Sequence, residues 1–214
     1  MSEAYSWRGG AELMLRHSVN YPHQIIIIEP LFEEVNRCRR LLINVMRGLA
    51  ANGIGSVLAD LPGTGESHTD ISAVSFSDWQ EALSAVTQLV KPVVIASLRG
   101  GALLDGGLAA KGYWRFAPET GTRIVRDLKR TQLSGSALYA GHAISDDFLA
   151  ALEGAPTAPH LPLRTLRLES DAGAADAKLP GSPLWRRAEP GDDPELAAAL
   201  VVDLTAWVKT CAAS

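Results

Sequence analysis

The residues of this chain that could do chemistry lie where short aliphatic runs end. Leu31–Glu34 follows the run Ile25–Ile28, and Ser97–Gly101 follows the run Val93–Ala96. Arg99, in the second of these segments, is a permanent cation that can bind a carboxylate or a phosphate through two parallel hydrogen bonds. The two segments therefore indicate a site for an acidic group, supplied either by the chain itself or by a ligand.

The segment after the first run supplies both carboxylates and main-chain donors. Glu33 and Glu34 are candidate partners for the arginine. An N–H group of Leu31 or Phe32, together with the N–H of Gly100, would form a pair of donors like an oxyanion hole. Three outcomes are open: the arginine pairs with a glutamate and fills the site, it binds a small anionic ligand such as a carboxylate, phosphate or acidic sugar, or it lies outside the pocket.

Aliphatic runs alternate with helical patterns along the chain, which predicts a mostly parallel, doubly wound α/β sheet with helices on both faces. Ligands of such sheets bind at the carboxyl ends of the strands, where both segments lie. The expected elements are strand Ile25–Ile28, helix Val35–Leu49 ending at Asn52-Gly53, strand Gly55–Asp60, a helix behind a capping box at Ser77-x-x-Gln80, strand Pro92–Ser97, a small-residue helix to about Ala110, strand Tyr113–Phe116, helices Thr122–Arg130 and Ser145–Leu152, strand Leu163–Glu169, a polar loop Ala172–Pro183, an edge strand Leu184–Ala188 and a final helix capped at Asp193-Pro194.

Composition places the chain among ordinary globular proteins. Its 214 residues are 47% hydrophobic and 21% charged, with a net charge of −4. One domain over residues 1–214 is expected, with a helical excursion at about 118–159. The acidic balance argues against a nucleic-acid partner. Met1–Arg16 lacks a signal-peptide core and no aliphatic run is long enough to span a bilayer, so we predict a cytoplasmic protein without a transmembrane segment.

Metal and nucleotide motifs are incomplete. The two cysteines and five histidines show no metal-ligand spacing. Gly63-x-Gly65 and Gly100-Gly101 do not complete a G-x-G-x-x-G loop, so no cofactor is predicted.

Two runs carry a family resemblance. Asp60–Ser67 (DLPGTGES) resembles the D-x-P-G-x-G-x-S turn common in α/β-hydrolases, and Val93–Leu103 resembles the region of their nucleophile elbow. Glu29–Arg40 (EPLFEEVNRCRR) is similar to the P-P-F-x-E-E-M-N-x-x-R-R run of the exosortase A system-associated hydrolases. This resemblance implies an α/β-hydrolase fold in a bacterial setting of exopolysaccharide production and PEP-CTERM protein sorting.

The resemblance implies a nucleophile at the strand-to-helix turn, and here it is missing. Small residues two before and two after the tip permit two registers, Ser97-x-Arg99-x-Gly101 and Ala96-x-Leu98-x-Gly100. The first places Arg99 at the tip and the second places Leu98 there, so neither supplies a serine, cysteine or aspartate. The family's base, a histidine after the last strand, is also missing because no histidine follows His160. Ser-His-Asp chemistry is therefore not expected.

Four other features have a plain structural interpretation. Arg37, Arg39, Arg40 and Arg47 are expected on a solvated helix face, with partner binding as the alternative. Glu169 and Asp171 occupy the region of the family's acid but have no histidine to orient. His142 is expected to be a surface or helix-cap residue, and Trp114 and Trp185 are expected to pack in the core or at the sheet edge.

Together these observations predict an α/β-hydrolase-fold protein with no catalytic residue of the ordinary kind. It would serve as a binding or accessory protein, with protein partners in an envelope or sorting system. The alternative is an active esterase, thioesterase or acyltransferase that uses an unorthodox group. A nucleotide-binding regulator has weaker support. The sequence does not identify the ligand, the partners or the oligomeric state.

Overall fold

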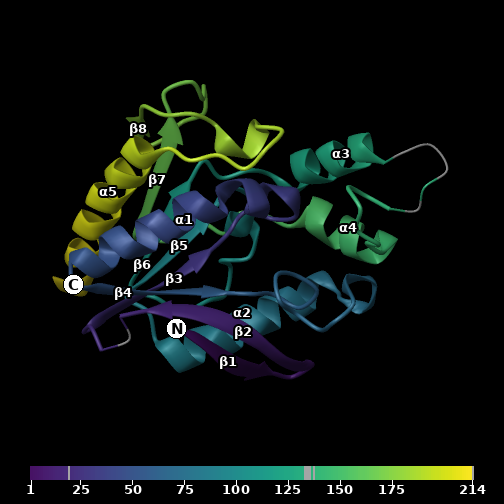
Figure 1. Cartoon of the computed structure of the whole chain (residues 1–214), viewed down its shortest axis with the longest axis horizontal. Helices are drawn as coiled ribbons and strands as arrows, with labels where there is room; N and C mark the ends of the chain where they lie inside the picture. The colour runs from purple at the N-terminus through teal and green to yellow at the C-terminus, as the bar shows by residue number, and fades with distance from the viewer. Residues whose placement is uncertain (19, 133–135, 137, 214) are drawn as a thin grey trace.

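The computed structural model describes residues 1–18, 20–132, 136 and 138–213 (Figure 1). Eight strands form one sheet in the order β1-β2-β4-β3-β5-β6-β7-β8. β1 pairs antiparallel with β2 and β2 antiparallel with β4, whereas the other neighbouring strands are parallel. The predicted mostly parallel sheet is confirmed. The strands are β1 Ser2–Trp7, β2 Gly10–His17, β3 His23–Ile28, β4 Ile54–Ala59, β5 Val94–Leu98, β6 Gly112–Phe116, β7 Leu163–Leu168 and β8 Ala177–Leu179.

Helices cover both faces of this sheet, with α1 and α5 on one face and α2 on the other (Figure 1). The α-helices are α1 Glu33–Ala51, α2 Phe76–Val90, α3 Gly121–Thr131, α4 Asp146–Gly154 and α5 Pro194–Ala213, and the short 3-10 helices are η1 Ile71–Ala73, η2 Arg99–Leu103 and η3 Leu184–Arg186. Ile25 and Ile27 pack into the core beneath α1 and α5, and Ile26 and Ile28 pack into the opposite core. The four isoleucines Ile25–Ile28 of β3 are apolar without a break because both faces of the strand are buried there.

The predicted start of α2 is wrong by two residues. Its N-cap is Ser75, whose hydroxyl accepts a hydrogen bond from the Asp78 N–H while the Asp78 carboxylate accepts one from the Ser75 N–H. The capping box predicted at Ser77-x-x-Gln80 does not form. A short carboxylate at the third helical position performs the reciprocal capping that we expected from glutamine.

The small-residue helix predicted to reach Ala110 is also wrong. It ends at Leu103 as the 3-10 helix η2, and the chain then turns through Gly107, whose φ is +77°. Gly106 and Gly107, with the left-handed conformation of Gly107, favour a loop over a helix here.

Two further predictions fail near the C-terminal edge of the sheet. β8 lies inside the segment predicted as a loop, and Leu184–Arg186 is a 3-10 turn rather than an edge strand. Leu184 and Trp185 are both buried in the same core. One helical turn can place two consecutive side chains in one core, whereas a strand would point them to opposite faces.

The N-terminal hairpin β1–β2 was not predicted at all. It turns at Gly9 and extends the sheet beyond β4. Tyr5 is buried in it, and its hydroxyl donates to the main-chain oxygen of Asp60 at 2.7 Å. The hairpin thus contacts the turn that follows β4.

The predicted helices between β6 and β7 are confirmed as α3 and α4, and Ser145 caps α4 as expected. The final helix is confirmed as α5, where the Asp193 carboxylate accepts the Leu196 N–H. By length and composition alone, α5 could cross a membrane. This is weak evidence for a membrane span, because one face of the helix is buried against the core and α1.

Candidate functional site

Arg99 occupies the tip of the turn between β5 and η2. Leu98 still has the extended φ of −112°, whereas Arg99 has a φ of +53°. A left-handed conformation is unusual and costly for an arginine, and strain of this kind is often found at functional sites. The geometry therefore selects the register Ser97-x-Arg99-x-Gly101. A Cβ on Gly101 would lie only 2.6 Å from the main-chain oxygen of Glu29, so the close approach of this turn to β3 requires glycine.

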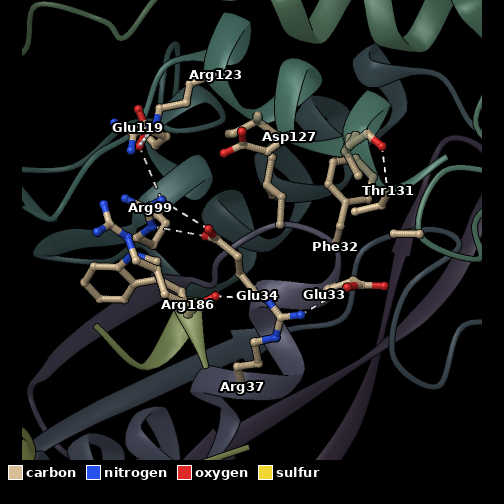
Figure 2. Close-up of a pocket in the computed structure, with 15 residues that line it drawn as sticks. Phe32, Glu33, Glu34, Arg37, Arg99, Glu119, Arg123, Asp127, Thr131 and Arg186 are labelled. Atoms are coloured by element: carbon tan, nitrogen blue, oxygen red, sulfur yellow. Dashed lines mark hydrogen bonds and ion pairs between the residues drawn. The ribbon is translucent and has the colours of Figure 1, made fainter. Parts of the chain in front are cut away.

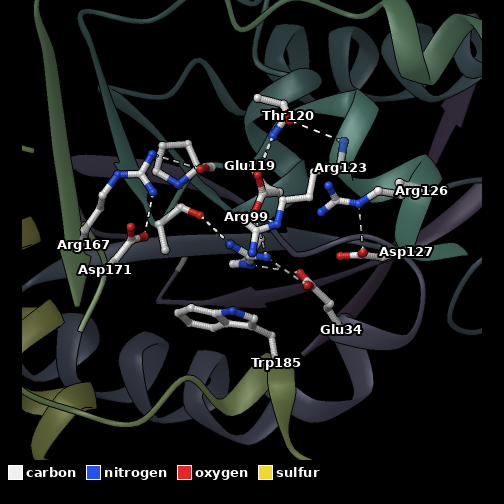
Figure 3. Close-up of polar contacts among 12 residues, drawn as sticks. Glu34, Arg99, Glu119, Thr120, Arg123, Arg126, Asp127, Arg167, Asp171 and Trp185 are labelled. Atoms are coloured by element: carbon white, nitrogen blue, oxygen red, sulfur yellow. Dashed lines mark hydrogen bonds and ion pairs between the residues drawn. The ribbon is translucent and has the colours of Figure 1, made fainter. Parts of the chain in front are cut away.

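The Arg99 side chain is held by three acceptors (Figures 2 and 3). Its Nε and Nη2 donate to the two carboxylate oxygens of Glu34, each at 3.1 Å. Nη2 also donates to Glu119 at 3.3 Å, and Nη1 donates to the Ala117 carbonyl at 3.1 Å. Of the three outcomes considered for Arg99, this geometry corresponds to pairing with a glutamate, and the partner is Glu34 rather than Glu33.

Trp185 closes the site from the side of β8. The guanidinium carbon of Arg99 lies 4.7 Å from the centroid of the Trp185 ring. Arg99 is only 7% exposed and Trp185 only 5% exposed, so this cation–π contact is largely desolvated. Trp185 follows β8, in the part of the chain where the resemblance places a catalytic histidine.

The charges of this cluster balance. Glu119 is shared with Arg123, whose Nε lies 3.3 Å from the same carboxylate oxygen that Arg99 contacts. Two arginines and two glutamates therefore meet with no net charge. Burial raises the pKa of Glu34, with the opposing effect of Arg99 second in size.

The loop after β3 supplies a cavity beside this cluster. The cavity has a volume of about 290 Å³ and is lined by Leu31, Phe32, Glu33, Glu34, Arg37, Arg99, Glu119, Arg123, Ile124, Asp127, Leu128, Thr131, Ala140, Trp185 and Arg186. We call it the Phe32 pocket. Phe32 begins α1 with a φ of +56°, and Glu33 pairs with Arg37 at 3.2 Å. Gly100 lies under the pocket, since a Cβ on it would be 2.6 Å from Ile124 and 2.9 Å from Leu31.

A second hollow of about 480 Å³ lies on the other side of Arg99, towards the loop after β7. The two hollows share five of their lining residues, which are Arg99, Glu119, Arg123, Trp185 and Arg186. The ion-pair cluster therefore separates the two hollows.

Glu29 and Asp60, at the carboxyl ends of β3 and β4, form a separate buried acidic pair. They are 7% and 6% exposed, and Arg39 approaches them at 3.3 and 3.7 Å. Burial raises the pKa of Glu29 to about 7, with Arg39 opposing and Asp60 adding to the rise. The carboxylate of Glu29 is therefore less favourable in the folded protein than in the unfolded chain.

Replacing Glu29 with glutamine should change how stability depends on pH. Because the folded protein holds this proton more tightly, the wild-type free energy of unfolding should fall between about pH 4.5 and 7 and stay lowered above pH 7. The shift corresponds to about 3 kcal/mol at most. In urea titrations, Glu29→Gln should gain stability relative to wild type from pH 5 to pH 8, and the exposed control Glu66→Gln should not. Parallel pH profiles for Glu29→Gln and wild type would contradict the assignment.

Most of the arginines predicted on a solvated face of α1 pair within the chain. Arg37 donates to the Trp185 carbonyl, and Arg40 pairs with Asp192 at 2.9 Å. Arg47 is exposed, as expected. These contacts favour a structural role for the first two.

The acids after β7 lie apart from the Arg99 cluster. Asp171 pairs with Arg167 at 2.7 Å and also accepts the Gly173 N–H, while Glu169 is exposed. The Asp171 carboxylate therefore has its partners within its own loop and β7.

His142 and the glycine turn after β4 have structural contacts. The His142 ring is half-buried, 6.1 Å from the Phe32 ring, which places it over the site rather than at the free surface. Gly63 and Gly65 have φ values of +75° and +55°. A Cβ on Gly65 would lie 2.4 Å from the Asp60 carboxylate, so this turn folds around Asp60.

His160 belongs to a second buried polar cluster. Asp105 is fully buried and accepts hydrogen bonds from Ser97 at 2.7 Å and from Arg115 at 2.7 and 2.8 Å. His160 lies 3.1 Å from the same carboxylate and stacks on Tyr113 with a ring separation of 3.4 Å. In this cluster the aspartate holds the serine directly, so it does not have the order of a catalytic triad.

Sequence reasoning missed two members of the site, Glu119 and Trp185. Glu119 comes three residues after β6, and Trp185 was assigned only a packing role. The rule that ligand-binding groups follow the carboxyl ends of parallel strands would have identified Glu119. No local signal marks Trp185, which reaches Arg99 only through the fold.

Comparison with known proteins identifies the fold. No protein-family model and no curated protein sequence matches the chain. Solved structures do match along nearly its whole length. Est1E from Butyrivibrio proteoclasticus with ferulic acid bound is 13% identical with a TM-score of 0.70, covering 97% of this chain and 99% of its own. Mouse alpha/beta hydrolase domain-containing protein 10 is 13% identical with a TM-score of 0.67, covering 98% and 99%.

Two further matches show a range of functions on this fold. A malate-bound esterase from Thermogutta terrifontis is 10% identical with a TM-score of 0.66, covering 99% of each chain. The bottromycin epimerase BotH is 12% identical with a TM-score of 0.56, covering 99% of this chain and 98% of its own. The chain has the α/β-hydrolase fold, as predicted. Because esterases and an epimerase share it, the fold does not decide the activity.

Proposed function

We propose that this protein is a non-catalytic member of the α/β-hydrolase fold, a binding or accessory protein that has lost Ser-His-Asp chemistry. The observation that carries the proposal is the ion-paired Arg99 at the strand-to-helix tip. An arginine stays protonated in proteins and has no lone pair to act as a nucleophile. Glu34 and Glu119 hold it in place.

The absence of a base supports the same conclusion. A hydroxyl nucleophile of this fold is activated by a histidine that follows the last strand. No histidine follows His160 in the sequence, and His160 pairs with the buried Asp105. Acyl transfer in this fold needs a nucleophile to attack the carbonyl and a base to take the nucleophile's proton. Both groups are missing here, so one catalytic group has not simply been replaced by another.

The cellular setting comes from resemblance. The run Glu29–Arg40 supports a place beside the exosortase A system-associated hydrolases, and hence in exopolysaccharide production or PEP-CTERM sorting. Proteins of such an envelope or sorting system are the proposed partners, and a small anionic molecule is the proposed ligand. We propose a cytoplasmic location. The organic acids bound to two neighbours of the same fold, ferulic acid and malate, support a small-molecule pocket.

Ester turnover tests the proposal against the alternative of an esterase, thioesterase or acyltransferase with an unorthodox group. A panel of p-nitrophenyl esters from acetate to octanoate should show no hydrolysis above the protein-free rate. Two variants assign any activity that appears. Gly100→Trp fills the floor beneath the pocket, and Arg99→Ala removes the arginine. Turnover that is lost in Gly100→Trp but kept in Arg99→Ala, with both variants folded by circular dichroism, would overturn the non-catalytic proposal.

A further inference from the structure

We infer that the Phe32 pocket binds an amphipathic organic anion, an aliphatic or aromatic carboxylate whose apolar part is buried against Phe32 and whose charge stays at the rim beside Arg186. This inference rests on the proposed function and names its ligand class. Figure 2 shows Phe32 and Thr131 on one side of the pocket and Arg99 and Arg186 on the other.

Eight of the fifteen residues around the pocket are charged, but most of the surface that faces the pocket is apolar. The apolar side chains that line it are Leu31, Phe32, Ile124, Leu128, Ala140 and Trp185. Phe32 is part of an aromatic group, with its ring 5.6 Å from Trp79 and 6.2 Å from Phe148. The volume of the pocket, about 290 Å³, is at the lower end for small-molecule sites, which usually measure about 300–1,000 Å³. An occupant of this space must be small and apolar over most of its length.

The charges inside the pocket are already compensated. Both carboxylate oxygens of Glu34 accept from Arg99, and Glu33 pairs with Arg37. Arg99 also donates to Glu119 and to a main-chain carbonyl. A charged ligand group buried here would have to displace one of these pairs, and an unpaired buried charge is costly. The buried part of the ligand is therefore neutral.

The rim carries a positive charge without a partner. Arg186 is exposed, lines the pocket, and its side chain forms no ion pair or hydrogen bond within the described part of the chain. The acid of the rim, Asp127, already has Arg126 and Arg130 at 3.6 Å. The uncompensated charge at the mouth is thus positive, which favours a carboxylate over an ammonium group.

Affinity for matched eight-carbon probes separates charge from apolar burial. Isothermal titration with octanoate, octan-1-ol and octylamine, all below their aggregation concentrations, should rank octanoate tightest. We expect octan-1-ol to bind about fivefold more weakly, since a rim ion pair contributes up to about 1 kcal/mol, and octylamine about tenfold more weakly. Cinnamate serves as the aromatic carboxylate, and we expect that it also binds.

Variants place the binding at this pocket. Arg186→Glu should weaken octanoate about tenfold, while the exposed control Arg47→Glu on α1 should stay within about twofold of wild type. Ile124→Trp should abolish binding by filling the pocket, provided that circular dichroism shows it folded. Because Arg186 is exposed, the Arg186→Glu variant should fold, and its octanoate affinity tests the inference even if Ile124→Trp does not fold.

Three outcomes would overturn the inference: no octanoate or cinnamate binding, equal affinity for octylamine, or an unchanged octanoate affinity in Arg186→Glu. None of these touches the proposed function, which is tested separately by ester turnover. Tight octanoate binding together with ester turnover would keep the ligand class and overturn the non-catalytic proposal, so the two failures are distinguishable.

Discussion

Replacing Arg99 with methionine is expected to lower the free energy of unfolding by about 3 kcal/mol, because breaking a buried ion pair leaves its partners charged and unpaired. Glu34 loses both of its bidentate hydrogen bonds, and Glu119 keeps Arg123 and the Thr120 N–H. Partial exposure of the Glu34 side chain, 27%, places the effect at the low end of the usual range. Urea unfolding followed by circular dichroism at pH 7 measures it.

A double variant isolates the pair from the strain of the turn. Methionine must adopt the same positive φ as Arg99, so backbone strain remains in both single and double variants. Arg99→Met/Glu34→Gln should recover a third or more of the lost stability, and the exposed control Arg126→Met should change it by less than about 0.5 kcal/mol. A loss below about 1 kcal/mol in Arg99→Met would show that the pair contributes little.

Removing Asp105 is expected to cost about 4 kcal/mol or to prevent folding. Asp105 is fully buried and is the shared acceptor of Ser97, Arg115 and His160. In Asp105→Ala the buried guanidinium of Arg115 keeps only a main-chain acceptor, the Ala158 carbonyl. An uncompensated buried arginine is among the most destabilising defects of a core.

Matched variants keep this second prediction testable if Asp105→Ala does not fold. Asp105→Asn retains the shape of the side chain and should unfold at a measurable urea concentration below that of wild type. Asp105→Ala/Arg115→Met should recover part of the loss, since it removes both charges. The exposed control Asp127→Ala should resemble wild type. Equal stability of Asp105→Asn and wild type would contradict a central role for the cluster.

The buried strands of the fold could be predicted because their apolar signal is local. Ile25–Ile28 is apolar at every position, which occurs when both faces of a strand are covered. The same reasoning located β4 to β7 and the helices α2, α3 and α4 between them. Alternation of strands and helices then leaves a doubly wound parallel sheet as the natural arrangement.

The elements that failed depend on tertiary contacts. The hairpin β1–β2 has charged residues at Glu3, Glu12 and Arg16, and it joins the sheet by pairing β2 with β4. η3 was mistaken for an edge strand, yet its conformation buries Leu184 and Trp185 together in one core. Short segments with weak periodicity do not reveal such contacts.

The sequence analysis named Arg99 as the centre of the candidate site but did not name all the residues that contact it. Arg99 could be paired with Glu33 or Glu34 because both segments follow buried strands, and the position of β3 beside β5 brings Glu34 to it. Glu119 and Trp185 join them from β6 and from the loop after β8, over separations of 20 and 86 residues. Which distant side chains complete a buried ion pair depends on strand order and loop paths, which no local pattern specifies.

We propose that an arginine held by Glu34 and Glu119 stands where a catalytic α/β-hydrolase has its nucleophile. Intact-protein mass spectrometry after incubation with a fluorophosphonate probe tests it most directly, with an active serine esterase as the positive control. We expect an unchanged mass for this protein under conditions that fully label the control. A single stoichiometric adduct that forms on the folded protein, and does not form when the protein is unfolded by heat before the probe is added, would contradict this proposal.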